Sequence, residues 1–316
     1  MSYSVGSLFA GIGGICYGFK QAKFSLKWAN EYNSKACETY SHNFKHKLVC
    51  EDIHQLKNPH DLGYVDVITS GFPCQAFSVA GYRKGFNDPR GNLFFETARF
   101  IDTLKPKAFL LENVKNLKGH DGGNTFKVIQ NVIENDLGYS FIPFILNSKD
   151  YGNIPQTRER IYIVGFKDQD LTEKFQVPKK IKLTKSIHDF IDTDQKDDKY
   201  YYHSDHQYFP TLSKEIQSRD TLYQWRRIYV RENKSNVCPT LTANMGTGGH
   251  NVPIFKDQHG IRKLTPKECV NFQGFPKGFK FPSEMANSHC YKQAGNSVVV
   301  PVIKRIATEI KNVLDN

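Results

Sequence analysis

The 316-residue sequence lacks the features that mark membrane-spanning and disulfide-stabilised proteins. It has no uninterrupted apolar run of 18 or more residues, so we expect no transmembrane helix. Its first residues lack the basic stretch and the apolar run of a secretory signal. The seven cysteines are odd in number, scattered and without C-x-x-C spacing. This pattern argues against a disulfide scaffold and a cysteine-based metal site, and it indicates a reducing cytosol.

Acidic residues are also scarce relative to basic ones. The chain has 43 Lys and Arg against 32 Asp and Glu, a formal net charge of +11, and an isoelectric point near 9.1. Residues 167–282 alone hold 20 Lys and Arg against 14 Asp and Glu. Such an excess attracts polyanions, and nucleic acid is the usual partner. A soluble protein that is merely basic would show the same balance, so charge alone does not decide the function.

The first half of the chain alternates short apolar segments with segments of helical periodicity. We expect strands at 3–9, 26–29, 48–50, 65–70, 108–111 and 160–166, and helices at 92–104 and 125–134. This alternation predicts an α/β fold with a mostly parallel sheet. The pattern becomes irregular after residue 167, and helical periodicity returns at 298–314. The sequence therefore predicts a second, smaller domain that precedes a C-terminal helix.

A glycine-rich segment at residues 9–14 (FAGIGG) follows the first expected strand and opens a helix. Glycines there let the backbone approach a ligand closely. Glu31 lies 20 residues after Gly11, at the end of the second strand, where a carboxylate can reach the ribose of a bound nucleoside. Position 16 is Cys, so the G-x-G-x-x-G pattern is incomplete, and a nucleoside fits better than a pyrophosphate. A glycine turn with a solvated Glu31 is the alternative.

Two further strands end in residues with reactive or ionisable side chains. Cys74, in the segment GFPCQ, should face the same crevice as the glycine loop, because ligands of α/β sheets bind at the carboxyl ends of strands. A nucleophile is favoured there over a buried thiol. Glu112 closes the strand 108–111, where a carboxyl group can donate a proton or a hydrogen bond, or merely occupy a turn. Arg158 and Arg160 share one parity, so in an extended segment both point to one face and suit a base edge, a phosphate or a surface salt bridge.

Taken together, these motifs resemble the bacterial DNA (cytosine-5-)-methyltransferases. The matching segments are SLFAGIGG, the strand end at Glu31, Glu51-Asp52-Ile53, GFPCQAFSVAG, LLENV, QTRERIYIVG, RKLTPKECVNFQGFP and QAGNSVVVPV. They span nearly the whole chain and keep the family order. The resemblance implies a Rossmann-like methyltransferase sheet with helices on both faces, built from residues 1–166 and 283–316. It also implies a target-recognition domain at 167–282, with DNA in the cleft between the two.

The resemblance also implies roles for individual residues. It assigns S-adenosylmethionine contacts to Phe9, Gly11, Ile12, Gly13, Glu31, Asp52, Ile53, Pro73, Leu93 and Asn296. It assigns catalysis to Cys74, Glu112, Arg158 and Arg160, and it involves no metal. It places DNA contacts at Gln75, Ser78 and the recognition segment with Thr240, and the basic side chains Arg83, Arg226 and Arg227 suit phosphates or guanines.

The implied reaction transfers a methyl group to C5 of a cytosine flipped out of a specific double-stranded DNA sequence. Cytosine C5 is a poor nucleophile, and attack by a Cys74 thiolate at C6 would turn the ring into an enamine that accepts the methyl group. Glu112 would take up the charge that develops near N3. Arg160 would hold the O2 edge, and Arg158 would position the loop or the base. The sequence identifies no group that removes the C5 proton.

The expected setting is a cytoplasmic, nucleoid-associated monomer. It would protect host DNA from a cognate restriction endonuclease that acts on the same site without a physical complex. One alternative is a tRNA cytosine-5 methyltransferase of the same fold, which the lack of a Cys-Phe-Thr tripeptide disfavours. Another is a nucleotide-dependent oxidoreductase, which leaves Cys74, Glu112 and the arginine pair unexplained. A third is an inactive DNA-binding relative.

Overall fold

The computed structural model describes residues 2–73, 93–247 and 251–316, which fall into two compact units. The first unit comprises Met1–Leu146, Glu159–Lys179 and Val302–Asn316, and the second comprises Asn147–Arg158 and Lys180–Pro301. Residues 147–158 and 283–301 thus pack with the second unit, although the sequence assigns them to the methyltransferase part. The functional division into a catalytic and a recognition domain stays a prediction.

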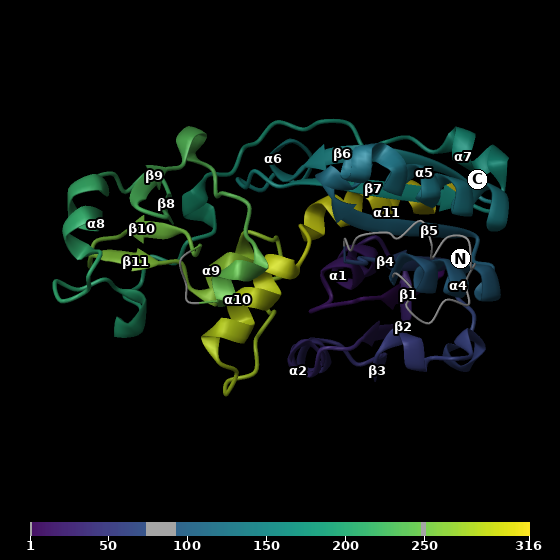
Figure 1. The fold of residues 1–316 in the computed structure, drawn as a ribbon, viewed down its shortest axis with the longest axis horizontal. Coiled ribbons are helices and arrows are strands. Elements are labelled where there is room, and N and C mark those ends of the chain that lie inside the picture. The colour runs from purple at the N-terminus through teal and green to yellow at the C-terminus, as the bar shows by residue number, and fades with distance from the viewer. Residues whose placement is uncertain (1, 74–92, 248–250) are drawn as a thin grey trace. The chain divides into compact units, whose positions relative to one another are not determined.

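The first unit is built on a seven-stranded sheet of order β3-β2-β1-β4-β5-β7-β6 (Figure 1). Its strands are β1 (Ser4–Leu8), β2 (Ser25–Glu31), β3 (Lys47–Cys50), β4 (Val67–Ser70), β5 (Ala108–Val114), β6 (Ser140–Asn147) and β7 (Glu159–Phe166). The neighbours from β3 to β5 pair in parallel, whereas β5 and β7 pair antiparallel. The predicted α/β class with a mostly parallel sheet is confirmed.

Both faces of this sheet are covered. Every residue of β1 and of β4 is buried, which requires packing partners on both sides because successive side chains of a strand point to opposite faces. The helices of this unit are α1 (Gly14–Gln21), α2 (Ser34–Asn43), α4 (Leu93–Leu104), α5 (Asn124–Asn131), α7 (Gln169–Lys174) and α11 (Val300–Asp315). The expected helix at 125–134 is α5 followed by one π-helical turn, Val132–Asp136.

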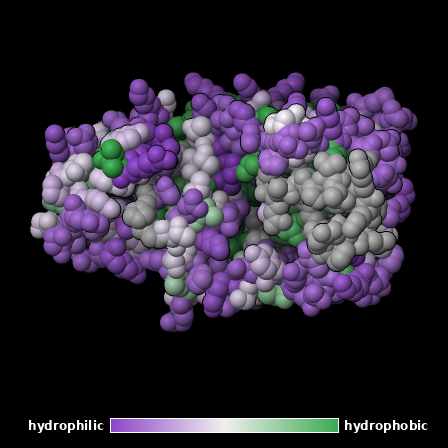
Figure 2. Space-filling model, in the orientation of Figure 1, coloured by the Kyte–Doolittle hydropathy of each residue, from purple (hydrophilic) through white to green (hydrophobic). Residues whose placement is uncertain are grey.

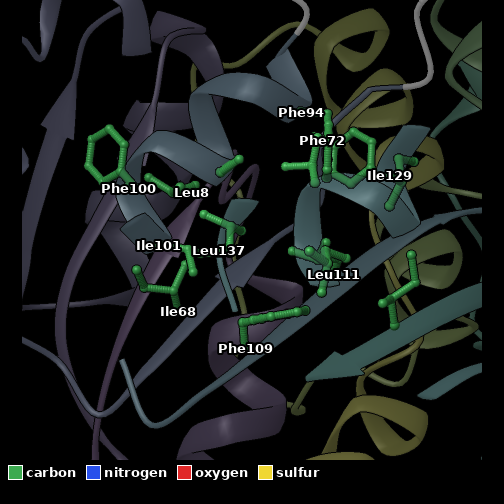
Figure 3. Close-up of a cluster of buried hydrophobic side chains, with 14 of the residues drawn as sticks. Leu8, Ile68, Phe72, Phe94, Phe100, Ile101, Phe109, Leu111, Ile129 and Leu137 are labelled. Atoms are coloured by element: carbon green, nitrogen blue, oxygen red, sulfur yellow. The ribbon is translucent and has the colours of Figure 1, made fainter. Parts of the chain in front are cut away.

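One large apolar cluster fixes the centre of the sheet beneath α4 and α5. It includes Leu8, Ile68, Phe109 and Leu111 from the strands and Phe94 from α4, all almost inaccessible to solvent (Figure 3). Burying aliphatic and aromatic side chains of this size contributes about 1.5–3 kcal/mol each to folding. The last residues of β1, β4 and β5 are therefore held on a rigid base.

The second unit has the short, irregular elements that the sequence predicts. Its four-stranded antiparallel sheet has the order β11-β10-β8-β9, and helices surround it. The elements are β8 (Tyr223–Arg226), β9 (Tyr229–Glu232), β10 (Ile254–Lys256), β11 (Ile261–Lys263), α6 (Ser148–Tyr151), α8 (Phe209–Glu215), α9 (Pro266–Asn271) and α10 (Asn287–Asn296). An apolar core joins this sheet to α8, with Tyr223, Ile254 and Leu212 among its buried residues and the rings of Tyr208 and Trp225 stacked 4.4 Å apart.

A fully buried arginine organises the second unit. The guanidinium of Arg262 donates to Asp257 Oδ2 at 2.6 Å and to both carboxylate oxygens of Glu268 at 2.9 Å. Glu268 also accepts from the backbone of Thr265 and thereby completes a capping box at the start of α9. Bidentate carboxylate contacts of this kind suit the planar guanidinium. Arg262 thus ties β11 to α9 through charge rather than apolar contact.

Two of the six cysteines that the structure describes are bonded to each other, which the scattered spacing did not predict. Cys37 in the first turn of α2 and Cys50 at the end of β3 form a disulfide, with their Cα atoms 6.0 Å apart. The scattered cysteines argued against a disulfide scaffold and gave no sign of this single bond, which forms because the parallel pairing of β2 with β3 brings α2 beside the end of β3. The other four cysteines described, Cys16, Cys238, Cys269 and Cys290, are buried free thiols.

Candidate active site

The site lies where the strand order of the first unit reverses. Strands β1 and β4 are central neighbours, and from them the chain continues outward in opposite directions, to β2 on one side and to β5 on the other. Loops that leave such a pair diverge and form a crevice at the carboxyl ends of the strands. The glycine loop follows β1, and Gly71-Phe72-Pro73 follows β4. The two motifs therefore share one edge of the sheet.

The glycine loop turns sharply through left-handed backbone conformations. Phe9, Gly11 and Gly13 have φ values of 52°, 56° and 86°, a region that favours glycine. The amide of Ala10 donates to the carbonyl of Asn30 at 2.9 Å, which ties the loop to the end of β2. A Cβ added to Gly11 would meet no described atom within 4 Å. The loop thus leaves open space above Gly11 for a ligand.

Glu31 is the last residue of β2, as predicted, and the residue is 7% exposed. Oε2 accepts the amide of Gly11 at 2.8 Å, and Oε1 accepts the amide of Asn33 at 2.9 Å. Each carboxylate oxygen has a second lone pair, so Glu31 can hold the loop in place and still accept a ligand hydroxyl. Asn33 caps α2 and is a contact that the sequence reasoning missed; an Asn before a helical segment was the signal available.

The chain leaving β3 adds a second wall. Asp52 caps the 3₁₀ turn Ile53–Gln55, where it accepts the His54 amide at 2.9 Å and contacts the His54 ring at 2.7 Å. The hydrogen bond from the His54 backbone, together with the nearby ring, lowers the pKa of Asp52. Ile53 is buried in the main core, and Asp52 is exposed. An exposed charged acceptor therefore stands next to a side chain that is anchored in the core, so the position of Asp52 at the exit of β3 is fixed.

Glu112 and Arg160 form a nearly buried ion pair. Arg160 Nε lies 3.2 Å from Glu112 Oε1, with side-chain exposures of 16% and 11%. The geometry follows from the register, because Val114 pairs with Arg160 and Glu112 stands two residues before Val114 on the same face of the sheet. The pair therefore presents a carboxylate and a guanidinium together at the carboxyl end of β5.

The segment that leads to Cys74 approaches this ion pair. A Cβ added to Gly71 would lie 3.9 Å from Glu112 Oε2 and 3.8 Å from the carbonyl oxygen of Phe9. The side-chain amide of Asn113 donates to the carbonyl of Phe72 at 2.8 Å and holds the segment against β5. Asn113 is another contact that the sequence did not assign. The loops after β1, β4 and β5 thus converge within a few ångströms.

Several predicted residues add less to this picture. Cys74, Gln75, Ser78 and Arg83 lie outside the described residues. Pro73 is exposed next to buried Phe72, and Leu93, the first residue of α4, packs partly buried against the main core. Ile12 is buried in the glycine loop. Asn296 ends α10 in the second unit and is exposed there, so its part in a cofactor pocket stays a prediction.

Arg158 and Arg160, which the sequence was expected to place on one face of an extended segment, have different partners. Arg158 precedes β7, which begins at Glu159, so strand alternation does not apply to it. Its buried guanidinium donates to the carbonyls of Leu241, Gly295 and Ser297 inside the second unit. Arg158 therefore fixes backbone, whereas Arg160 pairs with the carboxylate of Glu112.

The predicted DNA-reading residues of the second unit occupy two different settings. Thr240 donates to the carbonyl of Thr157 next to the Arg158 anchor. Arg226 and Arg227 lie at the turn between β8 and β9, where Arg227 has a φ of 58°. Ile228 in the same turn is 86% exposed, which marks a side chain that the sequence reasoning overlooked. The side of the molecule in Figure 2 is otherwise largely hydrophilic.

No metal site is present in the described parts of the chain. Among residues 2–73, 93–247 and 251–316, no group of three His, Cys, Asp or Glu side chains is arranged to hold an ion. None of the helices described there has the length and apolar character needed to cross a membrane.

Comparison with known proteins identifies the fold and the reaction class. A family model described as C-5 cytosine-specific DNA methylase matches residues 3–312. The chain belongs to this family. The type II methyltransferase M.Bsp6I of Bacillus sp. (strain RFL6) is 58% identical over 310 residues, which cover 97% of this chain and 98% of the relative. M.HhaI of Haemophilus parahaemolyticus is 37% identical over 321 residues, with 98% and 94% coverage.

Solved structures agree on the architecture. A DNMT2 variant from Spodoptera frugiperda superimposes with a TM-score of 0.76 at 23% identity, and the match covers all of both chains. A prophage-encoded putative DNA modification methyltransferase from E. coli gives a TM-score of 0.69, also at 23% identity. These likenesses support the fold. Together with the family match, they make the chain a DNA (cytosine-5-)-methyltransferase of the S-adenosylmethionine-dependent class.

Proposed function

We propose that this enzyme methylates C5 of one cytosine within a specific double-stranded DNA sequence, through a transient bond between Cys74 and C6 of the base. The observation that supports the proposal is the convergence at Gly71, three residues before Cys74. There the Glu112 carboxylate and the Phe9 carbonyl both lie within 4 Å of an added Cβ. A nucleophile that follows Gly71 in the chain would therefore lie near both the Glu112 carboxylate and the glycine loop.

The residues of the glycine loop fit the adenosine part of S-adenosylmethionine. The buried carboxylate of Glu31 retains lone pairs for ribose hydroxyls, and the space above Gly11 is open. Asp52 and Ile53 offer a polar acceptor and an apolar surface for adenine, and Phe9 offers a ring face. The bound cofactor supplies an electrophilic methyl group. Ile12, Gly13, Pro73, Leu93 and Asn296 would complete the pocket.

The chain's own groups would drive the chemistry on the base. The Cys74 thiolate adds to C6, and the electron pair of the C5–C6 double bond moves so that C5 becomes nucleophilic. Glu112 hydrogen-bonds at N3, and the guanidinium of Arg160, 3.2 Å from that carboxylate, keeps it oriented and contacts O2. Once C5 carries the methyl group, loss of the C5 proton to water expels the Cys74 thiolate and restores the aromatic ring.

Addition to C6 requires access to the face of the ring, which stacking blocks in a duplex. The target cytosine must therefore swing out of the helix, which costs a few kcal/mol of unstacking and unpairing. Backbone contacts from Gln75, Ser78 and Arg83 near the nucleophile would help to repay this cost. We propose base flipping as an obligatory step of this reaction.

Sequence recognition would come from the second unit. The turn between β8 and β9 carries Arg226 and Arg227, whose guanidiniums can pair with the O6 and N7 atoms of guanine. Thr240 stands on backbone that the Arg158 anchor holds. Arg158 would act on the reaction as a positioning residue. Because the similar proteins carry the name type II methyltransferase, we propose that the modification protects host DNA from a restriction endonuclease of the same specificity.

Bisulfite sequencing of DNA from cells that express the chain tests the proposal most directly. We expect one short sequence to be protected from conversion at a single cytosine. Cys74→Ala should abolish methyl transfer and leave S-adenosylmethionine binding near the wild-type value. An oligonucleotide with 5-fluorocytosine at the identified position should trap a denaturation-resistant adduct with the wild type, since fluorine cannot leave as a cation. Methylation by Cys74→Ala would refute the nucleophile assignment.

A further inference from the structure

The disulfide between Cys37 and Cys50 joins α2 to the end of β3, next to the proposed cofactor site formed by the glycine loop, Glu31 and Asp52. Cys37 stands in the first turn of α2, where its amide donates to the carbonyl of Asn33 at 2.9 Å. Cys50 is the last residue of β3. Their Cα atoms are 6.0 Å apart, within the usual range for bridged cysteines. The two cysteines are 13 residues apart in the sequence, and the packing of α2 beside the end of β3 brings their sulfur atoms within bonding distance.

Each cysteine lies close to Glu31 or Asp52, through strand pairing, a hydrogen bond or a short stretch of chain. Cys50 pairs with Glu31 in the register of β2 and β3. Cys37 follows Asn33, whose amide donates to the Glu31 carboxylate at 2.9 Å. Asp52, the cap of the 3₁₀ turn, comes two residues after Cys50. A bond between the two sulfurs closes a covalent loop of residues 37–50, which contains most of α2 and all of β3. Glu31 lies outside this loop and beside Cys50 in the strand pairing.

The two sulfurs differ in access to solvent. Cys50 is exposed, whereas Cys37 is buried at 6% exposure. Attack on a small disulfide in solution needs an accessible thiolate, and closure of an intramolecular bond needs a second thiol fixed nearby. Cys50 meets the first condition and Cys37 the second. The four other described cysteines are buried free thiols and do not form such a pair.

We propose that Cys37 and Cys50 are a reversible thiol–disulfide site whose oxidation fastens α2 to the exit of β3 and tightens cofactor binding. The proposal rests on the proposed function insofar as it takes this pocket to hold S-adenosylmethionine. The oxidant is a low-molecular-weight disulfide of the glutathione type. Closing the bond removes freedom from the segment with Asp52 before the ligand arrives, so less ordering cost falls on binding.

Thiol–disulfide exchange with oxidised glutathione forms the Cys37–Cys50 bond in two steps. The Cys50 thiolate attacks one sulfur of the small disulfide, forms a mixed disulfide and releases one thiolate. Cys37 gives its proton to solvent, attacks the Cys50 sulfur and releases the second small thiolate, which leaves the Cys37–Cys50 bond. Two electrons pass from the two protein thiols to the small disulfide, which becomes two thiols. Excess reduced glutathione reverses both steps.

The test uses the full chain with Cys74→Ala, so that the predicted nucleophile cannot react with the oxidant. The protein is equilibrated with glutathione at graded ratios of oxidised to reduced form, quenched with an alkylating agent, digested and mapped by mass spectrometry. We expect one cross-linked peptide pair, joined at Cys37 and Cys50, that disappears under reducing ratios. Calorimetric titration should show S-adenosylmethionine bound about 3-fold to 10-fold more tightly by the oxidised form.

Variants separate the possible results. Cys37→Ser and Cys50→Ser should each abolish the cross-link and the change in affinity, whereas Cys290→Ser, a buried thiol of the second unit, should keep both. Absence of the cross-link in excess oxidised glutathione would overturn the redox site. A cross-link with equal affinity in both forms would overturn its effect on the pocket. A cross-link in a protein that binds no S-adenosylmethionine in either form would instead count against the proposed cofactor pocket.

Discussion

The glycine loop offers a test in which two neighbouring substitutions should fail for different reasons. Gly11 and Gly13 both have left-handed backbone, with φ values of 56° and 86°. An alanine in that region costs about 1 kcal/mol or slightly more at either position. Their surroundings differ, because an added Cβ would be in open space at Gly11 and 2.2 Å from Cε2 of Phe44 at Gly13.

Phe44 cannot easily move away from a methyl group on Gly13. It is buried, and its ring lies 4.4 Å from that of Tyr17 and 4.5 Å from that of Tyr40. Overpacking a core in this way typically costs a further 1–3 kcal/mol. Gly13→Ala should therefore lower the free energy of unfolding by about 2–4 kcal/mol, whereas Gly11→Ala should lower it by about 1 kcal/mol.

The order should reverse for ligand binding. A methyl group on Gly11 would enter the space that we assign to S-adenosylmethionine, and a steric cost of about 1.4 kcal/mol corresponds to a 10-fold loss of affinity. Urea denaturation followed by circular dichroism measures the first quantity, and calorimetric titration the second. Equal loss of stability in both variants would refute the packing argument. Wild-type affinity in Gly11→Ala would show that the ligand does not lie over this loop.

Two further predictions follow from buried carboxylates. Glu31→Gln replaces an oxygen that accepts a backbone amide with an NH₂ group. We therefore expect a loss of about 1–3 kcal/mol in the free energy of unfolding, measured in urea, and weaker S-adenosylmethionine binding. Wild-type values of both quantities would contradict the assigned contacts. Arg262→Met should destabilise the second unit by about 3–5 kcal/mol, because Asp257 and Glu268 lose their buried cation. Burial, the largest single influence, opposes ionisation of Asp257, but the hydrogen bonds from Arg262, the His259 backbone and Tyr201, together with the charge of Arg262, outweigh it, so the pKa lies below the ordinary value of 3.8. The stability from this contact is therefore present at neutral pH and is lost as the pH falls below about 4 through the folded-state pKa. Thermal melts of the wild type between pH 7 and pH 3 should show that loss, and Arg262→Met, which lacks the ion pair, should show a smaller one.

Strand ends could be predicted from the sequence because they depend on local pattern. Glu31 ends β2 and Glu112 stands near the end of β5, each after an apolar segment that could only be a buried strand. Their meeting at one sheet edge then follows from the general rule for parallel sheets. In contrast, β6 was missed. It is an edge strand of half-buried residues with Pro143 inside it, and neither a clean alternation nor a continuous apolar run marks it.

Contacts between distant parts of the chain could not be predicted in this way. The carbonyl partners of Arg158 lie 83, 137 and 139 residues further along the chain, so no local pattern links them. The parity argument for Arg158 and Arg160 assumed an extended segment that includes both residues, whereas β7 begins at Glu159, after Arg158. The Cys37–Cys50 bond likewise depends on the pairing of β2 with β3 and not on the spacing of the cysteines.

The antiparallel direction of β7 makes the Glu112–Arg160 pairing independent of the length of the chain between β5 and β7. Since β5 and β7 run antiparallel, the chain leaves β5 and enters β7 at the same edge, and Val114 faces Arg160 across the pair. Residues 115–158 connect the two strands, and the two ends of this segment are held on neighbouring strands of the sheet. Insertions or deletions within it would leave the Glu112 carboxylate and the Arg160 guanidinium in register, so the geometry of this ion pair does not depend on the length of the segment.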